Sequence, residues 1–416
     1  MTSFPLSPAQ RAVRVLHDAD PTRSRHSTRR IFEVRGPLDV SAFRLALEAL
    51  VRRHEPLRTI YLSGDRQVVR AEAPQALHLV SRRPPRMPFD LARGPLLSVS
   101  VQPLGPDHHE IVLDMHLLAA DGWSMQVLLD DLSKLYRAAL LGVPASLPEL
   151  TVQYVDWAAW HATRVTSERR AELVRWWRGA LAEYPRHCAG GSLAASGAGR
   201  RRAVTLDPGV VSAIHALANS SGHTAFTLLA AACAVALTHR NQQDHLLLGL
   251  AVANRDHSAV EQLLGFFVTM TLLPVNLSGD PPFTMLMRRV AEATAAAYAH
   301  REVPLSDMTL SEEARAGARC EPLVRVNFAH HPSGSLGTLG LERCEIVEVP
   351  VFDTAKFALT IRAEEKADGS CDIWAEYDTS LHGDLEIDAL LDSYKAILAL
   401  VVDCGDSTVS ALWARA

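Results

Sequence analysis

The chain has 416 residues, of which 48% are hydrophobic and 21% are charged. This composition is typical of a globular protein with a sizeable buried core, and the length suits two lobes of ordinary size. The formal net charge of −5 excludes a global basic field that would attract nucleic acid. We therefore expect no nucleic-acid partner.

Cysteine spacing and hydropathy narrow the class of protein further. The six cysteines are scattered, without a CxxC motif or a Cys/His cluster at zinc spacing, which favours reduced thiols and no metal site. The N-terminal stretch MTSFPLSPAQ lacks the charged and apolar regions of a secretory signal. The longest apolar run, FTLLAAACAVAL at 226–237, is too short to cross a bilayer and is typical of a buried helix. We expect a soluble, cytoplasmic protein without a membrane partner.

The first expected elements are a strand and a helix. In residues 30–36 apolar and polar side chains alternate, as in a strand, and 40–54 carry apolar side chains at helical spacing. Residues 109–117 alternate again, which places Ile111 on one face and His116 on the other, at the end of the strand. Loops at strand ends are common places for chemistry because a rigid sheet holds them.

A loop and two helical stretches follow this strand. An Asp-Gly pair at 121–122 predicts a turn, after which Ser124 can cap a helix. The apolar stripe of that helix consists of Val127, Leu128, Leu132 and Leu135. A second helical block covers 154–181.

A stretch rich in Gly, Ala and Ser divides the chain. We place a linker at 186–203, between an N-terminal lobe at 1–185 and a C-terminal lobe at 204–416. The pattern then restarts, with strands expected at 201–206, 245–253, 323–331, 343–350, 356–363 and 372–378 and helices at 208–221, 224–239, 283–300 and 384–402. Two similar mixed α/β halves suggest a duplication, although no short repeat is visible.

A series of motifs resembles the condensation domains of nonribosomal peptide synthetases, in the same order along the chain. The motifs are SPAQRAV (7–13), RRHEPLRTIY (52–61), FDLARGPLL (89–97), HLLAADGWS (116–124), YVDWAAW (154–160), VANRDHSAVEQLLGFFVTMTLLPVNLSGDPPF (252–283), AYAHREVPL (297–305), EPLVRVNFA (321–329) and AKFALTI (355–361). The resemblance implies an α/β fold of two chloramphenicol-acetyltransferase-like lobes, which form a V-shaped pseudo-dimer with a central tunnel. It also implies that phosphopantetheine arms of carrier proteins enter this tunnel, where an amine or hydroxyl attacks a thioester.

The central motif of this family, HHxxxDG, is altered in one position. The sequence has His116 at the first position and the Asp-Gly pair at 121–122, but the second His is replaced by Leu117. A leucine side chain can neither accept a proton nor form a hydrogen bond. The loss of a positioned general base typically costs about 10²–10⁴ in rate, so ordinary amide synthesis by the usual route is doubtful. Reactant alignment and backbone donors could still accelerate acyl transfer.

Each residue of this loop has a chemical and a structural interpretation. His116 is either a catalytic imidazole or a structural histidine that hydrogen-bonds the neighbouring loop backbone, and we favour the structural role. By the resemblance, Asp121 forms a buried salt bridge with Arg58 that shapes the loop. Gly122 permits a backbone conformation that a side chain would obstruct, and could bind developing oxyanion charge or serve only as a turn glycine. We expect Trp123 to pack rather than to contact substrate.

The second half adds candidates that depart from the family pattern. His330 and His331 end a strand that carries a catalytic residue in related heterocyclisation domains, and alternation sends them to opposite faces. We hypothesise that one of them replaces the missing base; the alternative, which we favour, is a pair of surface histidines before a Pro turn. Thr269, Met270 and Ala358 also differ from the family motifs, and we expect them to reshape a tunnel lining or to reflect a site that is no longer used.

The favoured hypothesis is a free-standing condensation-like enzyme of natural-product and antibiotic biosynthesis. It would act on an acyl or aminoacyl thioester, by acyl transfer, cyclisation or rearrangement, with a non-standard mechanism. The chain ends at ALWARA without an adenylation or carrier module, so we expect it to meet its carrier protein in trans. We also expect a monomer, because two lobes form their own cleft. The phosphopantetheine arm would be the substrate tether, with no bound cofactor, and a small-molecule nucleophile or a second carrier would be the other partner.

Two alternatives stay open. The chain could be a catalytically inactive module that recruits or gates a carrier protein or a tailoring enzyme. It could also be an acyl-CoA-dependent acyltransferase of the same superfamily. The sequence has no Walker or dinucleotide loop, no GxSxG and no HExxH, which argues against a serine hydrolase and a metalloenzyme.

Overall fold

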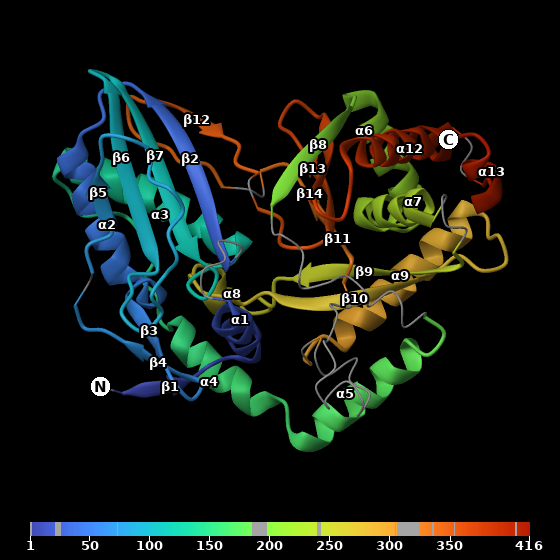
Figure 1. Ribbon diagram of the computed structural model, residues 1–416, viewed down its shortest axis with the longest axis horizontal. Coiled ribbons are helices and arrows are strands. Elements are labelled where there is room, and N and C mark those ends of the chain that lie inside the picture. The colour runs from blue at the N-terminus through green and yellow to red at the C-terminus, as the bar shows by residue number, and fades with distance from the viewer. Residues whose placement is uncertain are drawn as a thin grey trace. The chain divides into compact units, whose positions relative to one another are not determined.

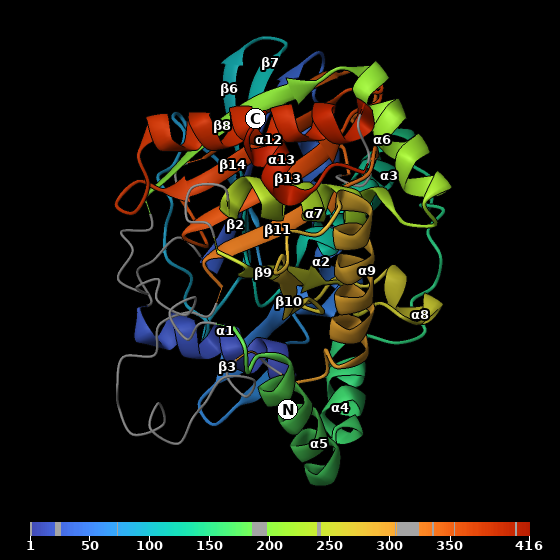
Figure 2. The same cartoon turned by 90° about the vertical axis from the view of Figure 1, so that its right-hand side faces the viewer.

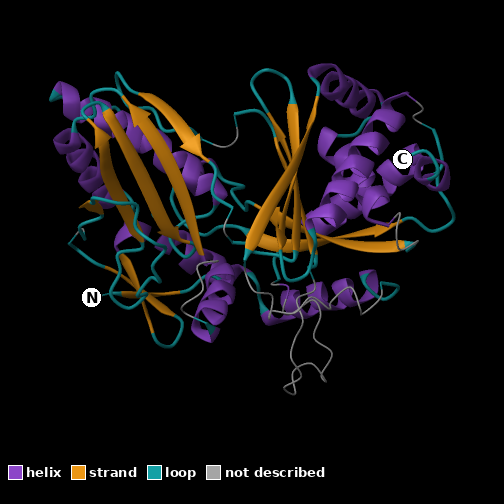
Figure 3. Cartoon of the chain, turned by 45° about the horizontal axis from the view of Figure 1, so that its top comes forward, coloured by secondary structure: helices purple, strands orange, loops and turns teal. Residues whose placement is uncertain are grey.

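The chain divides into two compact units, each built around a large sheet with helices packed against it (Figures 1 and 3). The computed structural model describes residues 2–20, 26–72, 74–184, 198–238, 243–303, 305, 324–334, 337–352, 354–403 and 406–416. Unit 1 comprises Met1–Thr166, Ala253–Val268 and Ser335–Val351, and unit 2 comprises Ser167–Val252, Thr269–Gly334 and Phe352–Ala416.

A five-stranded sheet with the order β12-β2-β7-β6-β5 forms the centre of unit 1. Its strands are β2 (Ser27–Arg35), β5 (Leu77–Leu79), β6 (Leu97–Gly105), β7 (His108–His116) and β12 (Glu345–Val349). Only β5 and β6 pair in parallel; the other neighbours are antiparallel. As predicted, Ile111, Leu113 and Met115 of β7 share one face and enter the apolar core of the unit.

Helices α2 (Val40–Arg53) and α3 (Gly122–Leu141) pack together against this core. Most predicted apolar positions of both helices are confirmed, because Phe43, Leu47, Leu128 and Leu132 are buried, whereas Leu135 is half-buried. The rest of unit 1 consists of a small sheet with the order β1-β4-β3 and short helices. These elements are β1 (Ser3–Pro5), β3 (Thr59–Leu62), β4 (Arg66–Val69), α1 (Pro8–Ala19), η2 (Glu55–Arg58), α4 (Tyr154–Arg164) and α8 (Ser258–Glu261).

A six-stranded mixed sheet with the order β10-β9-β11-β13-β14-β8 forms the centre of unit 2. Its strands are β8 (Gly199–Leu206), β9 (His245–Val252), β10 (Thr269–Asn276), β11 (Val326–His331), β13 (Leu359–Glu365) and β14 (Cys371–Asp378). The helices of the unit are α5 (Ser167–Ala180), α6 (Pro208–Ser220), α7 (Ala225–Thr238), α9 (Phe283–Ala299), α12 (Asp384–Asp403) and α13 (Val409–Trp413).

The two faces of this sheet differ in chemistry. Phe328, Ile361 and Ala375 belong to the apolar core that the sheet shares with α6, α7 and α12, which lie over the strands in Figure 2. The alternate positions carry polar and aromatic side chains, such as Arg362 and Trp374, which stand opposite each other on β13 and β14. We call the first the helix face and the second the open face, although Leu173 and Trp177 of α5 pack against Leu272 at the β10 edge of the second.

No single helix in the described part of the chain has the length and hydropathy of a membrane span. The consecutive helices α6 and α7 reach that threshold only when taken together, with a bend of 107° between them. Nearly all of α7 is buried in the core of unit 2, which accounts for its apolar composition.

Two expectations from local pattern, one helix boundary and one strand pairing, differ from the structure. The helical block at 154–181 is two helices, α4 in unit 1 and α5 in unit 2. The segments expected at 343–350 and 356–363 are not paired with each other, because β12 pairs with β2 whereas β13 pairs with β11 and β14.

The continuous lobes that we expected also differ from the compact units, since 253–268 and 335–351 pack into unit 1. Most of the expected linker, residues 186–197, lies outside the described residues, and its last part, 199–203, is strand β8.

Candidate functional site

The altered motif forms the connection between β7 and α3 in unit 1. His116 is the last residue of β7, and Asp121 is the N-cap of α3, where its carboxylate accepts the Ser124 N–H at 2.8 Å. The expected capping role of Ser124 was therefore wrong. Aspartate at this position satisfies a backbone donor at the helix start that has no partner within the helix.

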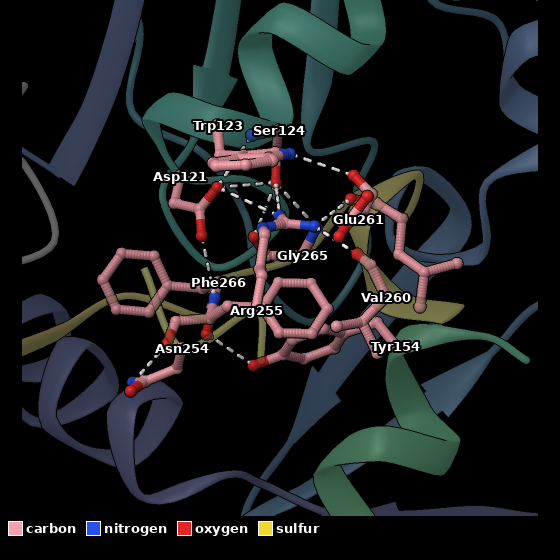
Figure 4. A network of polar contacts seen from close by, with 12 residues as sticks. Asp121, Trp123, Ser124, Tyr154, Asn254, Arg255, Val260, Glu261, Gly265 and Phe266 are labelled. Carbon is pink, nitrogen blue, oxygen red and sulfur yellow. Dashed lines mark hydrogen bonds and ion pairs between the residues drawn. The ribbon is translucent and has the colours of Figure 1, made fainter. Parts of the chain in front are cut away.

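Asp121 is also the centre of a buried polar network (Figure 4). Its carboxylate accepts hydrogen bonds from the Ser124 hydroxyl at 2.8 Å and from the Phe267 backbone N–H at 3.0 Å. It forms an ion pair with Arg255 at 3.2 Å, and both side chains are almost fully buried. The network thus fixes the start of α3 to the 253–268 segment of the same unit.

Arg255 is held from several directions. Its guanidinium donates to the Val260 and Leu263 carbonyls at 2.6 and 2.9 Å and to the Ser124 hydroxyl at 2.8 Å. It also lies 4.0 Å from the centre of the Phe267 ring, a cation–π distance. Burial lowers the pKa of Arg255, and the Asp121 carboxylate opposes this shift.

The expected partnership of Asp121 with Arg58 was wrong. Arg58 ends the short helix η2, where its guanidinium donates to Glu55 at 3.2 Å and to the Arg70 carbonyl. Arg255 is the residue that sequence reasoning missed. It lies in the motif at 252–283 that supported the family resemblance, but no local pattern linked it to a carboxylate 134 positions earlier.

His116 occupies a buried, uncharged environment. Its Nδ1 accepts the Leu118 backbone N–H at 3.1 Å, so the neutral ring carries its proton on Nε2, which lies 3.3 Å from Nδ1 of His17. Burial, followed by the nearby His17 and His26, lowers the pKa of His116 to about 3. Both ring nitrogens have partners, and the ring is neutral near pH 7. This geometry fits the structural interpretation of His116.

Leu117 continues the backbone beyond the strand without adding a polar group. Its N–H donates to the His26 carbonyl at 2.9 Å, and its partly buried side chain packs against the core of unit 1. The position usually held by the second histidine therefore offers only apolar surface.

Gly122 and Trp123 begin helix α3 at the surface of unit 1. A Cβ added at Gly122 would meet no heavy atom within 4 Å, so the expected steric need for glycine was wrong. Trp123 is 44% exposed, and its indole N–H donates to the Glu261 carbonyl at 3.0 Å. The indole lies 5.7 Å from the Arg255 guanidinium, so one part of the ring packs and another part is open to solvent.

His330 and His331 lie in unit 2, at the end of β11. The ladder with β13 places His330 beside Ala363, on the helix face, where its Nε2–H donates to the Glu365 carboxylate at 2.9 Å. His215 of α6 donates to the same oxygen at 2.9 Å. Burial raises the pKa of Glu365, but the hydrogen bonds and charges of the two histidines together outweigh it, and the net pKa is lowered.

His331 points to the open face and is not an exposed surface residue. Burial, followed by the charges of Arg362 and His330, lowers the pKa of His331 to about 4. Its ring is therefore neutral near pH 7 and chemically able to accept a proton. The expectation that the two histidines face opposite sides is confirmed by the strand register.

The three expected lining residues all lie in unit 2 and are half-buried. Thr269 and Met270 begin β10, opposite Val252 and Ala251 of β9. Ala358 precedes β13, and its carbonyl accepts the Asp378 N–H at 3.0 Å. Their role as a tunnel lining stays a prediction.

Comparisons with known proteins agree with this architecture. The family model described as "Condensation domain" matches residues 1–414. Malpibaldin synthetase of Mortierella alpina is 32% identical over 381 residues, which cover 84% of this chain and 7% of that protein. Chondramide synthase cmdD of Chondromyces crocatus is 29% identical over 432 residues, covering 96% of this chain and 11% of the relative. The chain thus spans only a small part of the length of these relatives.

Solved structures show the same fold. The X-domain from teicoplanin biosynthesis superposes with a TM-score of 0.84 at 22% identity, covering 98% of this chain and 96% of that one. The first condensation domain of the calcium-dependent antibiotic synthetase, in complex with substrate analogue 3a, gives a TM-score of 0.80 at 19% identity, with 98% of each chain covered. These similarities confirm the predicted mixed α/β, chloramphenicol-acetyltransferase-like fold class.

Proposed function

Because the chain belongs to the condensation-domain family, we propose that it binds a carrier-protein-tethered acyl or aminoacyl thioester as a recruitment or gating module of natural-product biosynthesis. In this role it would not be a catalyst of amide formation. The single observation that carries the proposal is the state of the motif loop. Its only imidazole, His116, is buried, neutral and hydrogen-bonded through both nitrogens, and the next residue is Leu117.

The framework of the loop is intact although the base is missing. The buried ion pair between Asp121 and Arg255 holds the start of α3, and the backbone at Gly122 faces open space. A partner of a buried ion pair is costly to lose, since removing one typically costs about 3–5 kcal/mol by stranding the other. The loop thus keeps its shape without a general base, which suits binding better than proton transfer.

Membership of the condensation-domain family indicates which class of protein this chain would bind. A carrier protein with its phosphopantetheine arm is the expected partner of a condensation domain. One solved relative of the same fold is the X-domain of teicoplanin biosynthesis in complex with OxyB. A tailoring enzyme from the same biosynthetic pathway is therefore the second partner to test.

The test separates binding from turnover. Cognate carrier proteins are loaded with candidate acyl groups, and their binding to this chain is measured beside the unloaded carriers. Intact mass of the carrier is then followed over time. We expect tighter binding of the loaded carrier with an unchanged mass. Transfer, loss or rearrangement of the acyl group that depends on the chain would overturn the proposal.

One observation favours a second candidate, an acyl-transfer, cyclisation or rearrangement enzyme that uses His331 as its base. His331 is neutral near pH 7 and lies on the open face, whereas His330 is bound to Glu365 on the helix face. In this case His331→Ala abolishes the change in acyl mass and His330→Ala retains it. Equal turnover of both variants would remove this candidate.

A further inference from the structure

Three successive arginines on β8 meet different surroundings. Arg200 and Arg202 point to one side, where they form ion pairs at 2.7 Å with Asp384 and Asp388 of α12. Arg201 points to the open face, as strand alternation requires. There it lies 4.0 Å from the centre of the Trp374 ring and 4.4 Å from that of Phe352. Two of the three cations thus have carboxylate partners and the third has aromatic ones.

A second guanidinium approaches the same indole from the other neighbouring strand. Arg362 of β13 stands opposite Trp374 of β14, with its guanidinium carbon 4.2 Å from the ring centre. In the strand order β13-β14-β8, Trp374 therefore has one arginine on each flank. Trp374 itself is buried and donates its indole N–H to Glu364 at 3.1 Å.

Neither arginine has an ion-pair partner within 4.0 Å among the described residues, although the carboxylates of Glu364, Asp372 and Glu376 lie near enough to raise the pKa of one or both. No hydrogen bond or ion pair within 4.0 Å links Arg201 or Arg362 to a carboxylate there, and the buried Nε of Arg362 has no hydrogen-bond partner. Two nearby carboxylates have other donors, since Glu364 accepts from Trp374 and Asp372 accepts from Lys366 at 2.7 Å. A buried cation without a hydrogen-bonded partner of opposite charge is costly, and proteins normally pair such groups.

The electrostatics agree with this geometry. Burial lowers the pKa of Arg201, and it lowers the pKa of Arg362 to about 10, although nearby carboxylates oppose both shifts. Stacking on an aromatic ring uses the faces of a guanidinium and leaves its in-plane N–H donors available. The in-plane donors of each guanidinium form a fork that matches the paired oxygens of a carboxylate or phosphate.

We infer that Arg201, Trp374 and Arg362 form a binding site for an oxyanion, a carboxylate or a phosphate group, on the open face of the unit 2 sheet. The indole holds the two guanidiniums in place, and their free edges donate to the bound group. The site is distinct from the Asp121 loop of unit 1, and its ligand does not depend on the proposed recruitment function.

The experiment uses the full chain and two simple probes, inorganic phosphate and acetate. Each is titrated by calorimetry at constant ionic strength, with sodium chloride as the control ion. We expect saturable binding of at least one probe, and the preferred probe assigns the group as phosphate or carboxylate. No saturable binding of either probe would overturn the inference.

Variants locate the site. Arg201→Gln and Arg362→Gln are expected to weaken binding about ten-fold or more, since each removes a charge-assisted donor. Arg200→Gln is the matched control, because Arg200 neighbours Arg201 but pairs with Asp384 on the other side. An equal loss in the Arg200 variant would overturn the inference.

Two further variants keep the test decisive. Arg362→Lys retains the charge but loses the planar fork, so we expect weaker binding in a protein whose unfolding midpoint is unchanged. Glu376→Gln removes the remaining nearby carboxylate, which stands opposite Arg201 on β14. We expect equal or tighter binding in this variant. Binding that appears only after Glu376 is removed would identify Glu376 as an internal counter-ion and overturn the inference.

Discussion

The Asp121 carboxylate and the Arg255 guanidinium form a buried ion pair that joins the motif loop to a segment from the other half of the sequence. Asp121 caps α3, and Arg255 holds the 253–268 segment through carbonyls at Val260 and Leu263. Each side chain therefore neutralises the charge of the other and also forms hydrogen bonds that hold the backbone around it. The start of α3 is therefore held by one residue of the motif, Asp121, and by one far outside it, Arg255.

We predict that Arg255→Ala lowers the free energy of unfolding by about 3–5 kcal/mol, because it leaves the Asp121 carboxylate buried without its cation. Urea denaturation measures the change. Arg58→Ala is the matched comparison and should cost about 1 kcal/mol or less, since its ion pair with Glu55 is partly exposed. A larger loss of unfolding free energy in the Arg58 variant than in the Arg255 variant would contradict the prediction and would show that Arg58 matters more for stability.

The buried ring of His116 predicts a pH dependence of stability. Unfolded His116 binds a proton below its usual pKa of about 6.5, whereas the folded protein binds it only near pH 3. Between these values the unfolded state holds more protons, so the free energy of unfolding falls as pH falls, by up to ~1.4 kcal/mol per pH unit from this residue.

His116→Gln should flatten this dependence, because glutamine can still accept the Leu118 N–H but does not titrate. Denaturant titrations at a series of pH values between 3 and 6.5 measure it. His78→Gln is the control, because His78 is an exposed residue of β5. Identical slopes for wild type and the His116 variant would contradict the buried, neutral state of the ring.

Leu117→His tests whether the loop has lost only its base. If the loop still presents a bound thioester correctly, the variant should catalyse acyl transfer about 10²–10⁴ faster than the wild type, the usual contribution of a positioned general base. Leu117→Asn, which is polar but cannot act as a base near pH 7, is the control. A variant that folds and binds the loaded carrier but shows no gain would mean that more of the catalytic site than the base has been lost.

Gly122→Ala should leave the protein as stable as the wild type, within about 0.5 kcal/mol, because an added Cβ meets no atom within 4 Å. Binding of the acylated carrier is the informative measurement. If the thioester passes close to this backbone, the methyl group weakens binding while the unfolding curve stays unchanged. A large loss of stability would instead show that glycine is needed for the local backbone.

Much of the secondary structure followed from local pattern. The strand that ends at His116 and the helix at 40–54 were predicted within about a residue of their ends, because alternation and helical spacing record which face of an element is buried. The opposite orientation of His330 and His331 followed from the same alternation.

The sequence by itself determined the order of these elements, the family and the missing base at Leu117, since each of these can be identified from short local motifs. Only the tertiary structure decided that Asp121 pairs with Arg255, that β12 joins the sheet of unit 1, and that His330 is bound to Glu365. These contacts join residues far apart in the chain. They depend on the packing free energy of a whole unit, which no short stretch of sequence encodes.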